Sequence, residues 1–353
     1  MPIKICFIKD IRGFGDVNFL MPNSVQISES GKVIVCDGGN DRICVFDEKL
    51  NEYTEVGKRG YSKYRFLEPV GAFVDKNENT YVMDWHNHRV VILDKDLVYH
   101  DEFGLFSSSM KNASIGIVNF IKIYLATVIR ILRRKGSYLR THFKTDNERV
   151  QVEYSILKRI AGVGYFTKLY LKKYLGRAYL INDHSINKPN GICLMGEKLV
   201  LSQKNFRCIT VFSKDKPFKK IENIKFPFPD MEFGRLGNVT WDDRNKLLYV
   251  CDERNEKIWV FDRDLKYLRC LSGEDSGQGK FLPFAITLIE DRYIGVCGGY
   301  NFQIIDPNTG QIVFKSHELG ELHGICYATV QGVIYVANRS QNLIHCFKLI
   351  FDK

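Results

Sequence analysis

Short runs of apolar residues recur along most of the chain, and polar, turn-forming residues separate these runs. Residues 33–37 read VIVCD and residues 42–46 read RICVF, each a short run of β-branched and other apolar residues beside one charged residue, as expected of a β-strand. Similar pairs of runs recur, and each is followed by a looser polar run, such as YTEVG at residues 53–57. The pattern therefore predicts an all-β fold of short strands, with four strands in each unit.

The strand pattern forms an internal repeat of about 47 residues. Six openings can be aligned: PNSV from Pro22, PVGA from Pro69, PNGI from Pro189, LGNV from Leu236, PFAI from Pro283 and LHGI from Leu322. The second and third openings are 120 residues apart, so this connection holds an insertion. Six units of four strands predict one six-bladed β-propeller.

A polar turn joins the second and third strands of each unit. Its central residue is Asn40, Asn87, Asn205, Asn255 or Asn301, with Gln341 in the sixth unit. Asparagine suits such turns because it tolerates left-handed backbone angles and bonds to its own backbone. An acid and a base often bracket the turn, and we expect them to bond there: Asp37 with Arg42, Asp84 with Arg89 and Asp252 with Lys257.

The turn of the second unit reads Asp84-Trp85-His86-Asn87-His88-Arg89, followed by an apolar strand. This pattern resembles the NHL repeat, and the resemblance extends over all six units. It implies a six-bladed propeller. Propellers of this kind serve as binding modules, as enzymes and as sensors, so the resemblance carries less for function than for fold. The fifth and sixth units depart from the pattern, with Gly298 and Asn338 where the acid is expected.

The sixth unit ends before a fourth strand can form. The first residues of the chain, which include KICFIKD at 4–10, precede the first unit and have no other partner. We therefore expect the N-terminal run to supply the outer strand of the last blade and to close the ring.

Residues 105–182 interrupt the repeat between the second and third units. Residues 115–132 read IGIVNFIKIYLATVIRIL, and in a helix their polar members would form one narrow stripe. The run is slightly short for a membrane crossing, and each basic residue inside it would cost about 2.5–3.5 kcal/mol there. We expect a mainly α-helical, amphipathic insertion. Residues 1–104 would then hold blades 1 and 2 with the closing strand, and residues 183–353 would hold blades 3–6.

The positive charge of the chain is concentrated in this insertion. Residues 105–181 contain 15 of the 51 Lys and Arg residues but 3 of the 41 Asp and Glu residues, which leaves the remainder at −2. Basic side chains among tyrosines are typical of a membrane–water boundary. The expected docking residues are basic (Lys122, Arg130, Arg133, Arg134, Lys135, Lys168, Lys172 and Lys173) and aromatic (Phe120, Tyr165, Phe166 and Tyr170).

These features predict peripheral attachment to an anionic membrane surface. Docking on a protein partner stays open as an alternative, because an amphipathic insertion can also pack on protein. Nucleic acid is the less favoured partner, since the propeller itself is slightly acidic. We expect a cytoplasmic protein, because the N-terminal run lacks the apolar core of a secretory signal and the ten cysteines contain no Cys-x-x-Cys pair.

Ligands of propellers usually bind at the mouth of the central channel, where the innermost strands begin. The repeat places Asn23, Val70, Asn190, Gly237, Phe284 and His323 there, and the ligand candidates among them are Asn23, Asn190 and His323. Asn190 lies in a Pro-Asn-Gly motif similar to the metal-binding motif of lactonase-type propellers, and that similarity implies a calcium site. No carboxylate stands at the equivalent positions, although Ca²⁺ prefers charged oxygens.

A comparison with lyase-type propellers, which use several channel histidines for zinc, leaves only His323 as a match. We read His88 as a structural residue of the repeat, His86 as a surface residue and the strand cysteines as packing residues. The sequence therefore predicts a non-catalytic binding scaffold beside a membrane, with no cofactor, metal or catalytic residue. A lactonase-like or lyase-like enzyme and an RNA-binding propeller are the alternatives.

Overall fold

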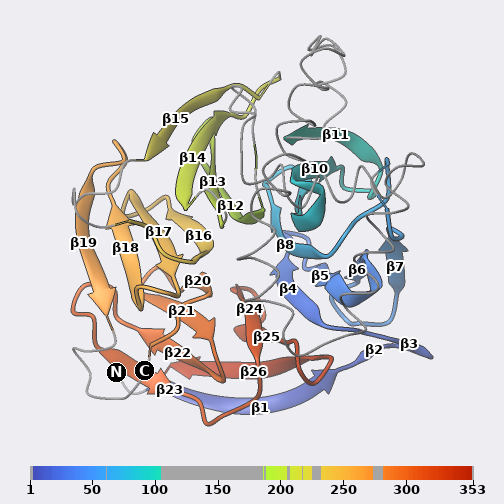
Figure 1. Ribbon diagram of the computed structural model, residues 1–353. Coiled ribbons are helices and arrows are strands. Elements are labelled where there is room, and N and C mark those ends of the chain that lie inside the picture. The colour runs from blue at the N-terminus through green and yellow to red at the C-terminus, as the bar shows by residue number, and fades with distance from the viewer. Residues whose placement is uncertain are drawn as a thin grey trace, which may run out of the picture. The chain divides into compact units, whose positions relative to one another are not determined.

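The computed structural model describes residues 3–60, 62–104, 186, 188–204, 207–216, 218–224, 232–272 and 281–351. These residues belong to the unit formed by residues 1–107 and 182–353. They form six four-stranded antiparallel sheets arranged around one axis, like blades (Figure 1). The innermost strand of each blade contacts the innermost strands of both neighbours, so the ring is closed. The predicted six-bladed β-propeller is confirmed.

The first three blades flank the insertion in sequence. Blade 1 contains β4 (Pro22–Ile27), β5 (Val33–Asp37), β6 (Arg42–Phe46) and β7 (Tyr53–Val56). Blade 2 contains β8 (Pro69–Val74), β9 (Thr80–Asp84), β10 (Arg89–Leu93) and β11 (Tyr99–Gly104). Blade 3 contains β12 (Pro189–Met195), β13 (Lys198–Gln203), β14 (Cys208–Ser213) and β15 (Lys220–Ile224).

The other three blades complete the ring. Blade 4 contains β16 (Leu236–Asp242), β17 (Leu247–Asp252), β18 (Lys257–Phe261) and β19 (Tyr267–Ser272). Blade 5 contains β20 (Ala285–Ile289), β21 (Tyr293–Gly298), β22 (Asn301–Ile305) and β23 (Ile312–Lys315). Blade 6 contains β24 (Leu322–Ala328), β25 (Val333–Asn338), β26 (Leu343–Phe351) and β1 (Ile3–Ile11).

Five innermost strands begin at the residue that the repeat predicts. The exception is β20, which begins at Ala285, two residues after Pro283. The described residues contain two short 3-10 turns, η1 (Gly38–Asn40) and η2 (Trp85–Asn87), and no α-helix. Within that part of the chain, no helix is long and apolar enough to cross a membrane. The predicted helical insertion lies outside the described residues.

The N-terminal strand closes the ring as predicted. Strand β1 pairs antiparallel with β26 over almost its whole length, from Ile3 opposite Phe351 to Ile11 opposite Ile344. The two ends of the chain consequently lie close together at the edge of blade 6 (Figure 1). A 2.7 Å contact between Asp10 Oδ1 and His345 Nδ1 adds a side-chain link between the two strands.

The hydrophobic core lies between neighbouring blades. One cluster joins Val35 of blade 1 to Ile344 of blade 6, and another joins Tyr249 of blade 4 to Val296 of blade 5. Both faces of the middle strands are covered in this way, which explains why runs such as VIVCD are almost wholly apolar. The cysteines belong to this core as apolar packing residues. All ten are free of disulfide bonds, and most are buried in strands.

The repeat turn works differently from the prediction. Asn40 and Asn87 do not take the left-handed conformation; the residue after each of them does, with φ of 56° at Asp41 and 54° at His88. The asparagine amide instead bridges the turn: Asn87 Nδ2 donates to Asp84 Oδ2 at 2.5 Å and to the Gly60 carbonyl at 2.7 Å. The asparagine is therefore selected for its two donors, which hold the carboxylate and the preceding loop together.

Two of the three predicted acid–base pairs form. Arg42 Nε lies 2.8 Å from Asp37 Oδ2, and Arg89 Nε lies 2.8 Å from Asp84 Oδ2. The third prediction is wrong. Lys257 Nζ lies over the Trp259 ring, 5.7 Å from its centre, while the Trp259 indole donates to Asp252 at 3.1 Å. The Asp252 carboxylate therefore accepts a hydrogen bond from Trp259 and makes no ion pair with Lys257.

Candidate functional site at the channel mouth

The second residue of the innermost strand is a β-bulge in several blades. The pairing register skips Asn23, Asn190 and His323. Asn23 Nδ2 donates to the carbonyl of Pro69 at 3.3 Å, and Asn190 Nδ2 donates to the carbonyl of Leu236 at 2.7 Å. In both cases the acceptor is the first residue of the next blade. Asn23 and Asn190 are buried and connect neighbouring blades, whereas His323 lines a cavity.

The other side chains at the mouth come from two positions that the sequence did not single out. The first position precedes the innermost strand and holds Met21, Glu68, Lys188, Arg235 and Glu321 in blades 1, 2, 3, 4 and 6. The second position follows the second strand and holds Gly38, Trp85, Lys204, Glu253, Gly299 and Arg339 in blades 1 to 6. Antiparallel pairing places the two positions of a blade side by side, so charged groups of both signs gather at one end of the ring.

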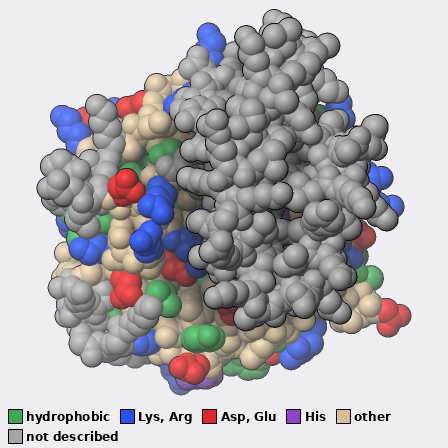
Figure 2. Space-filling view, in the orientation of Figure 1, with side chains coloured by type: hydrophobic (Ala, Val, Ile, Leu, Met, Phe, Trp, Pro, Cys, Tyr) green, Lys and Arg blue, Asp and Glu red, His purple; other side chains and the backbone are tan. Residues whose placement is uncertain are grey.

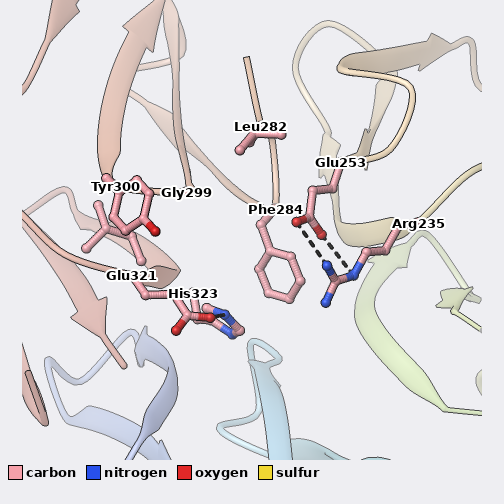
Figure 3. Close-up of a pocket in the computed structure, with 9 residues that line it drawn as sticks. Arg235, Glu253, Leu282, Phe284, Gly299, Tyr300, Glu321 and His323 are labelled. Carbon is pink, nitrogen blue, oxygen red and sulfur yellow. Dashed lines mark hydrogen bonds and ion pairs between the residues drawn. The ribbon is translucent and has the colours of Figure 1, made fainter. Parts of the chain in front are cut away.

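A cavity of about 200 Å³ lies at this end, between blades 4, 5 and 6. Its lining residues are Arg235, Glu253, Leu282, Phe284, Gly299, Tyr300, Glu321, Leu322 and His323. The Phe284 ring lies between His323 on one side and Arg235 on the other (Figure 3). Arg235 makes a two-pronged pair with Glu253, at 3.1 Å from Nη1 to Oε1 and 3.0 Å from Nε to Oε2. A ligand here would meet an aromatic face and charged groups together.

His323 is held as a neutral imidazole. Its ring packs on Phe284 with 4.6 Å between ring centres, and its Nε2 lies 3.0 Å from Glu321 Oε1. Burial, and after it the charge of Arg339, lowers the pKa of His323 from 6.5 to about 4. At neutral pH the ring therefore offers a hydrogen-bonding nitrogen without adding positive charge.

The Glu68 carboxylate contacts two side chains, one of them from a blade that is not its neighbour in the ring. Its Oε1 lies 3.1 Å from Arg339 Nη2 and its Oε2 lies 2.9 Å from His86 Nε2. Arg339 belongs to blade 6 and Glu68 to blade 2, so the pair passes over blade 1, where Gly38 has no side chain. Burial opposes ionisation of Glu68, but His86 and Arg339 hold its pKa below the ordinary value. His86 is half-exposed at this surface, as the sequence predicts, and contributes to the pair.

Lys204 is partly buried at the mouth and lacks an acidic partner. Among the described residues, no carboxylate lies within ion-pair distance of its ammonium, which faces the Trp85 ring at 5.1 Å from the ring centre. Lys188 lies over the same ring at 3.9 Å. Burial, and after it the Arg235 guanidinium, lowers the pKa of Lys204 to about 8. Lys204 also adds to the field that lowers the pKa of His323.

The mouth therefore carries an excess of positive charge on a mixed surface. Glu68, Glu253 and Glu321 each contact a basic or imidazole group, while Lys204 has no counter-charge in the described part of the chain. On the described portion of the face in Figure 2, basic and acidic side chains are intermixed, with no wide patch of one sign. Within the described ranges, no three His, Cys, Asp or Glu side chains are close enough to hold a metal ion.

Solved structures share the fold. A streptogramin B lyase is 12% identical with a TM-score of 0.56, covering 99% of this chain and 98% of the other. Virginiamycin B lyase from Staphylococcus aureus is 11% identical with a TM-score of 0.55, covering 99% and 100%. A protein of unknown function from Bacteroides thetaiotaomicron is 12% identical with a TM-score of 0.59, covering 99% and 76%. At this identity the similarity establishes the propeller fold alone.

No protein-family model matches the chain, and no curated protein sequence matches it. All of the predicted membrane-docking residues, from Phe120 to Lys173, lie outside the described residues. The buried His88 fits the structural role predicted for it, because its Nδ1 accepts a hydrogen bond from the Lys188 backbone at 3.2 Å.

Proposed function

We propose that this protein is a binding propeller of the NHL type whose channel mouth receives an acidic segment of a protein partner. The observation that carries the proposal is Lys204, a partly buried cation without a carboxylate partner in the described part of the chain. Burial is the first cause of the lowered pKa values of Lys204 and His323, and the charges of Arg235, Arg339 and Lys204 add to it. Because the carboxylates at the mouth are paired, we expect a positive field there. An anion entering this field is attracted before it makes any contact.

The cavity between blades 4, 5 and 6, which Arg235 lines, adds selectivity. Phe284 and the exposed Tyr300 provide aromatic surface, while the Arg235–Glu253 pair and His323 provide hydrogen-bonding groups. An acidic residue next to an apolar or aromatic one would place its carboxylate near the cations and its neighbour against Phe284. Such mixed surfaces are typical of the centre of protein interfaces.

The experiment is isothermal titration of the full chain with two short peptides, one with a Glu-Phe-Glu core and one with Gln-Phe-Gln. We expect the first to bind and the second to bind at least about tenfold more weakly. Lys204→Gln should lower the affinity for the Glu-Phe-Glu peptide by about five- to tenfold, which corresponds to a loss of about 1–1.4 kcal/mol of binding free energy. Lys95→Gln is the matched control, because Lys95 is exposed and paired with Asp96 in the turn between β10 and β11. Equal affinity for both peptides would rule out the proposal.

We further propose that residues 105–182 attach the propeller to an anionic membrane surface. Support comes from the charge distribution, since this segment carries all of the net positive charge of the chain. Six basic groups near anionic lipid would provide attraction of about 6 kcal/mol. Co-sedimentation with phosphatidylserine vesicles should retain the full chain and lose a variant in which a short linker replaces residues 105–182. Equal retention of both proteins, or of neither, would contradict the attachment.

A further inference from the structure

Lys204 has the surroundings of a reactive amine. Lys204 is the residue after β13. It occupies the repeat position that in other blades places Trp85, Glu253 and Arg339 at the mouth. Within the described residues its ammonium makes no hydrogen bond or ion pair, and its contact is the face of Trp85. A lysine becomes a nucleophile when burial and neighbouring cations favour the neutral amine. Both conditions hold here, because Lys204 is partly buried, Lys188 lies over the same Trp85 ring, and the Arg235 charge also disfavours the ammonium.

We propose that Lys204 captures anionic aldehydes at the channel mouth by forming an imine with them. The attraction of the anionic group rests on the proposed function of the mouth, whereas the bond-forming step rests on Lys204 alone. The neutral amine adds to the carbonyl carbon, and the carbinolamine then loses one water molecule. One C=N bond replaces one C=O bond, with no oxidant or reductant required.

Burial is the first cause of the lowered pKa of Lys204, and the charged groups around its amine act in both directions. Arg235 and Lys188 disfavour the ammonium, whereas Glu253 and Glu68 favour it. Both carboxylates are paired with an arginine, Glu253 with Arg235 and Glu68 with Arg339. With a pKa of about 8, roughly 20% of the amine is neutral at pH 7.4, compared with about 0.1% for an ordinary lysine. After allowing for the weaker nucleophilicity of a less basic amine, we expect about tenfold faster imine formation.

The probe is pyridoxal 5′-phosphate, an aldehyde that carries a phosphate, with pyridoxal as the comparison that lacks it. The full chain is incubated with each probe, the imine is reduced with borohydride, and the labelled peptides are quantified by mass spectrometry. We expect Lys204 to be labelled about tenfold faster than Lys95 by pyridoxal 5′-phosphate at pH 7.5, with a rate midpoint near pH 8. Pyridoxal closes to an internal hemiacetal and labels every amine more slowly, so the ratio of Lys204 to Lys95 labelling is compared, and we expect a larger ratio with the phosphate-bearing probe. Labelling of Lys204 at the rate of Lys95, or with a midpoint near pH 10, would overturn the proposal.

Lys204→Arg separates this inference from the proposed function. Arginine keeps the positive charge and cannot form the imine, so this variant should retain affinity for the Glu-Phe-Glu peptide and lose the label. The pH dependence also differs: peptide affinity needs the ammonium and should fall above pH 8, whereas labelling needs the amine and should rise. If the peptide fails to bind while Lys204 is still labelled selectively, the binding function is wrong and the reactive amine stands.

Discussion

His323 is a partly buried histidine, with 15% of its side chain exposed, and its neutrality should be visible in the stability of the protein. Its pKa is about 4 in the folded chain and 6.5 in the unfolded one, so the unfolded chain binds more protons between these values. The stability contributed by His323 is complete above pH 6.5 and is lost as the pH falls through 4. The loss corresponds to about 3 kcal/mol.

His323→Gln should therefore flatten the pH dependence of unfolding. Urea titrations give the free energies of unfolding of the wild type and the variant at pH 7.5 and pH 4.5. Between these two pH values, we expect the wild type to lose about 2–3 kcal/mol more of its free energy of unfolding than the variant loses. A difference that is the same at both pH values would show that the ring is not held neutral.

Arg89 and Arg42 occupy the same repeat position and differ in how deeply their partners are buried. Arg89 pairs with Asp84 and Glu102, which are 0% and 6% exposed, whereas Arg42 pairs with Asp37 and with Glu55, which is 42% exposed. Removing Arg89 leaves two buried carboxylates without their cation. We expect Arg89→Met to cost about 3–5 kcal/mol in chemical denaturation, and Arg42→Met about half as much. Equal losses would mean that burial of the second carboxylate is unimportant.

At the scale of the strand, local patterning was enough to predict most of the fold. The apolar run that marks β5 or β17 is set by neighbouring residues only, and so is the turn that follows it. The mouth could not be predicted in this way. Bulges at Asn23 and Asn190 turn their side chains toward the next blade, and those bulges depend on contacts between blades. The two repeat positions that do line the mouth vary in charge from blade to blade, and this variation was the available signal.

The innermost strands lie so close together that some glycines are required. A Cβ on Gly237 would lie 2.2 Å from the backbone carbonyl oxygen of Phe284 in the next blade, which cannot move alone. A Cβ on Gly71 would lie 2.6 Å from the end of the flexible Met83 side chain. We expect Gly237→Ala to cost about 3 kcal/mol or more and Gly71→Ala about 1 kcal/mol. Thermal unfolding of the two variants compares them, and a larger loss in Gly71→Ala would contradict this account of the packing.

At the scale of the molecule, the chain separates a near-neutral ring from a strongly basic segment. The ring gathers charges of both signs at its mouth, where pairing leaves a small positive excess around Lys204. The basic segment at residues 105–181 holds the charge that would act at longer range. Recognition at the mouth and attachment through the insertion are therefore expected to respond to different variants, and salt should weaken the attachment more strongly.

Closure of the ring by the N-terminal strand gives the last prediction. Without residues 1–11, β26 would lose its outer partner, the His345–Asp10 contact and the packing of Phe7 on Phe347. Blade 6 would then keep only β24, β25 and β26, and the outer edge of β26 would be exposed without a partner strand. We expect the melting midpoint to fall by about 10 °C. A synthetic peptide of residues 3–11 should restore it when added in excess, and a scrambled peptide of the same composition should not, because restoration requires the register of β1 against β26. An unchanged midpoint after truncation would show that the ring closes without this strand.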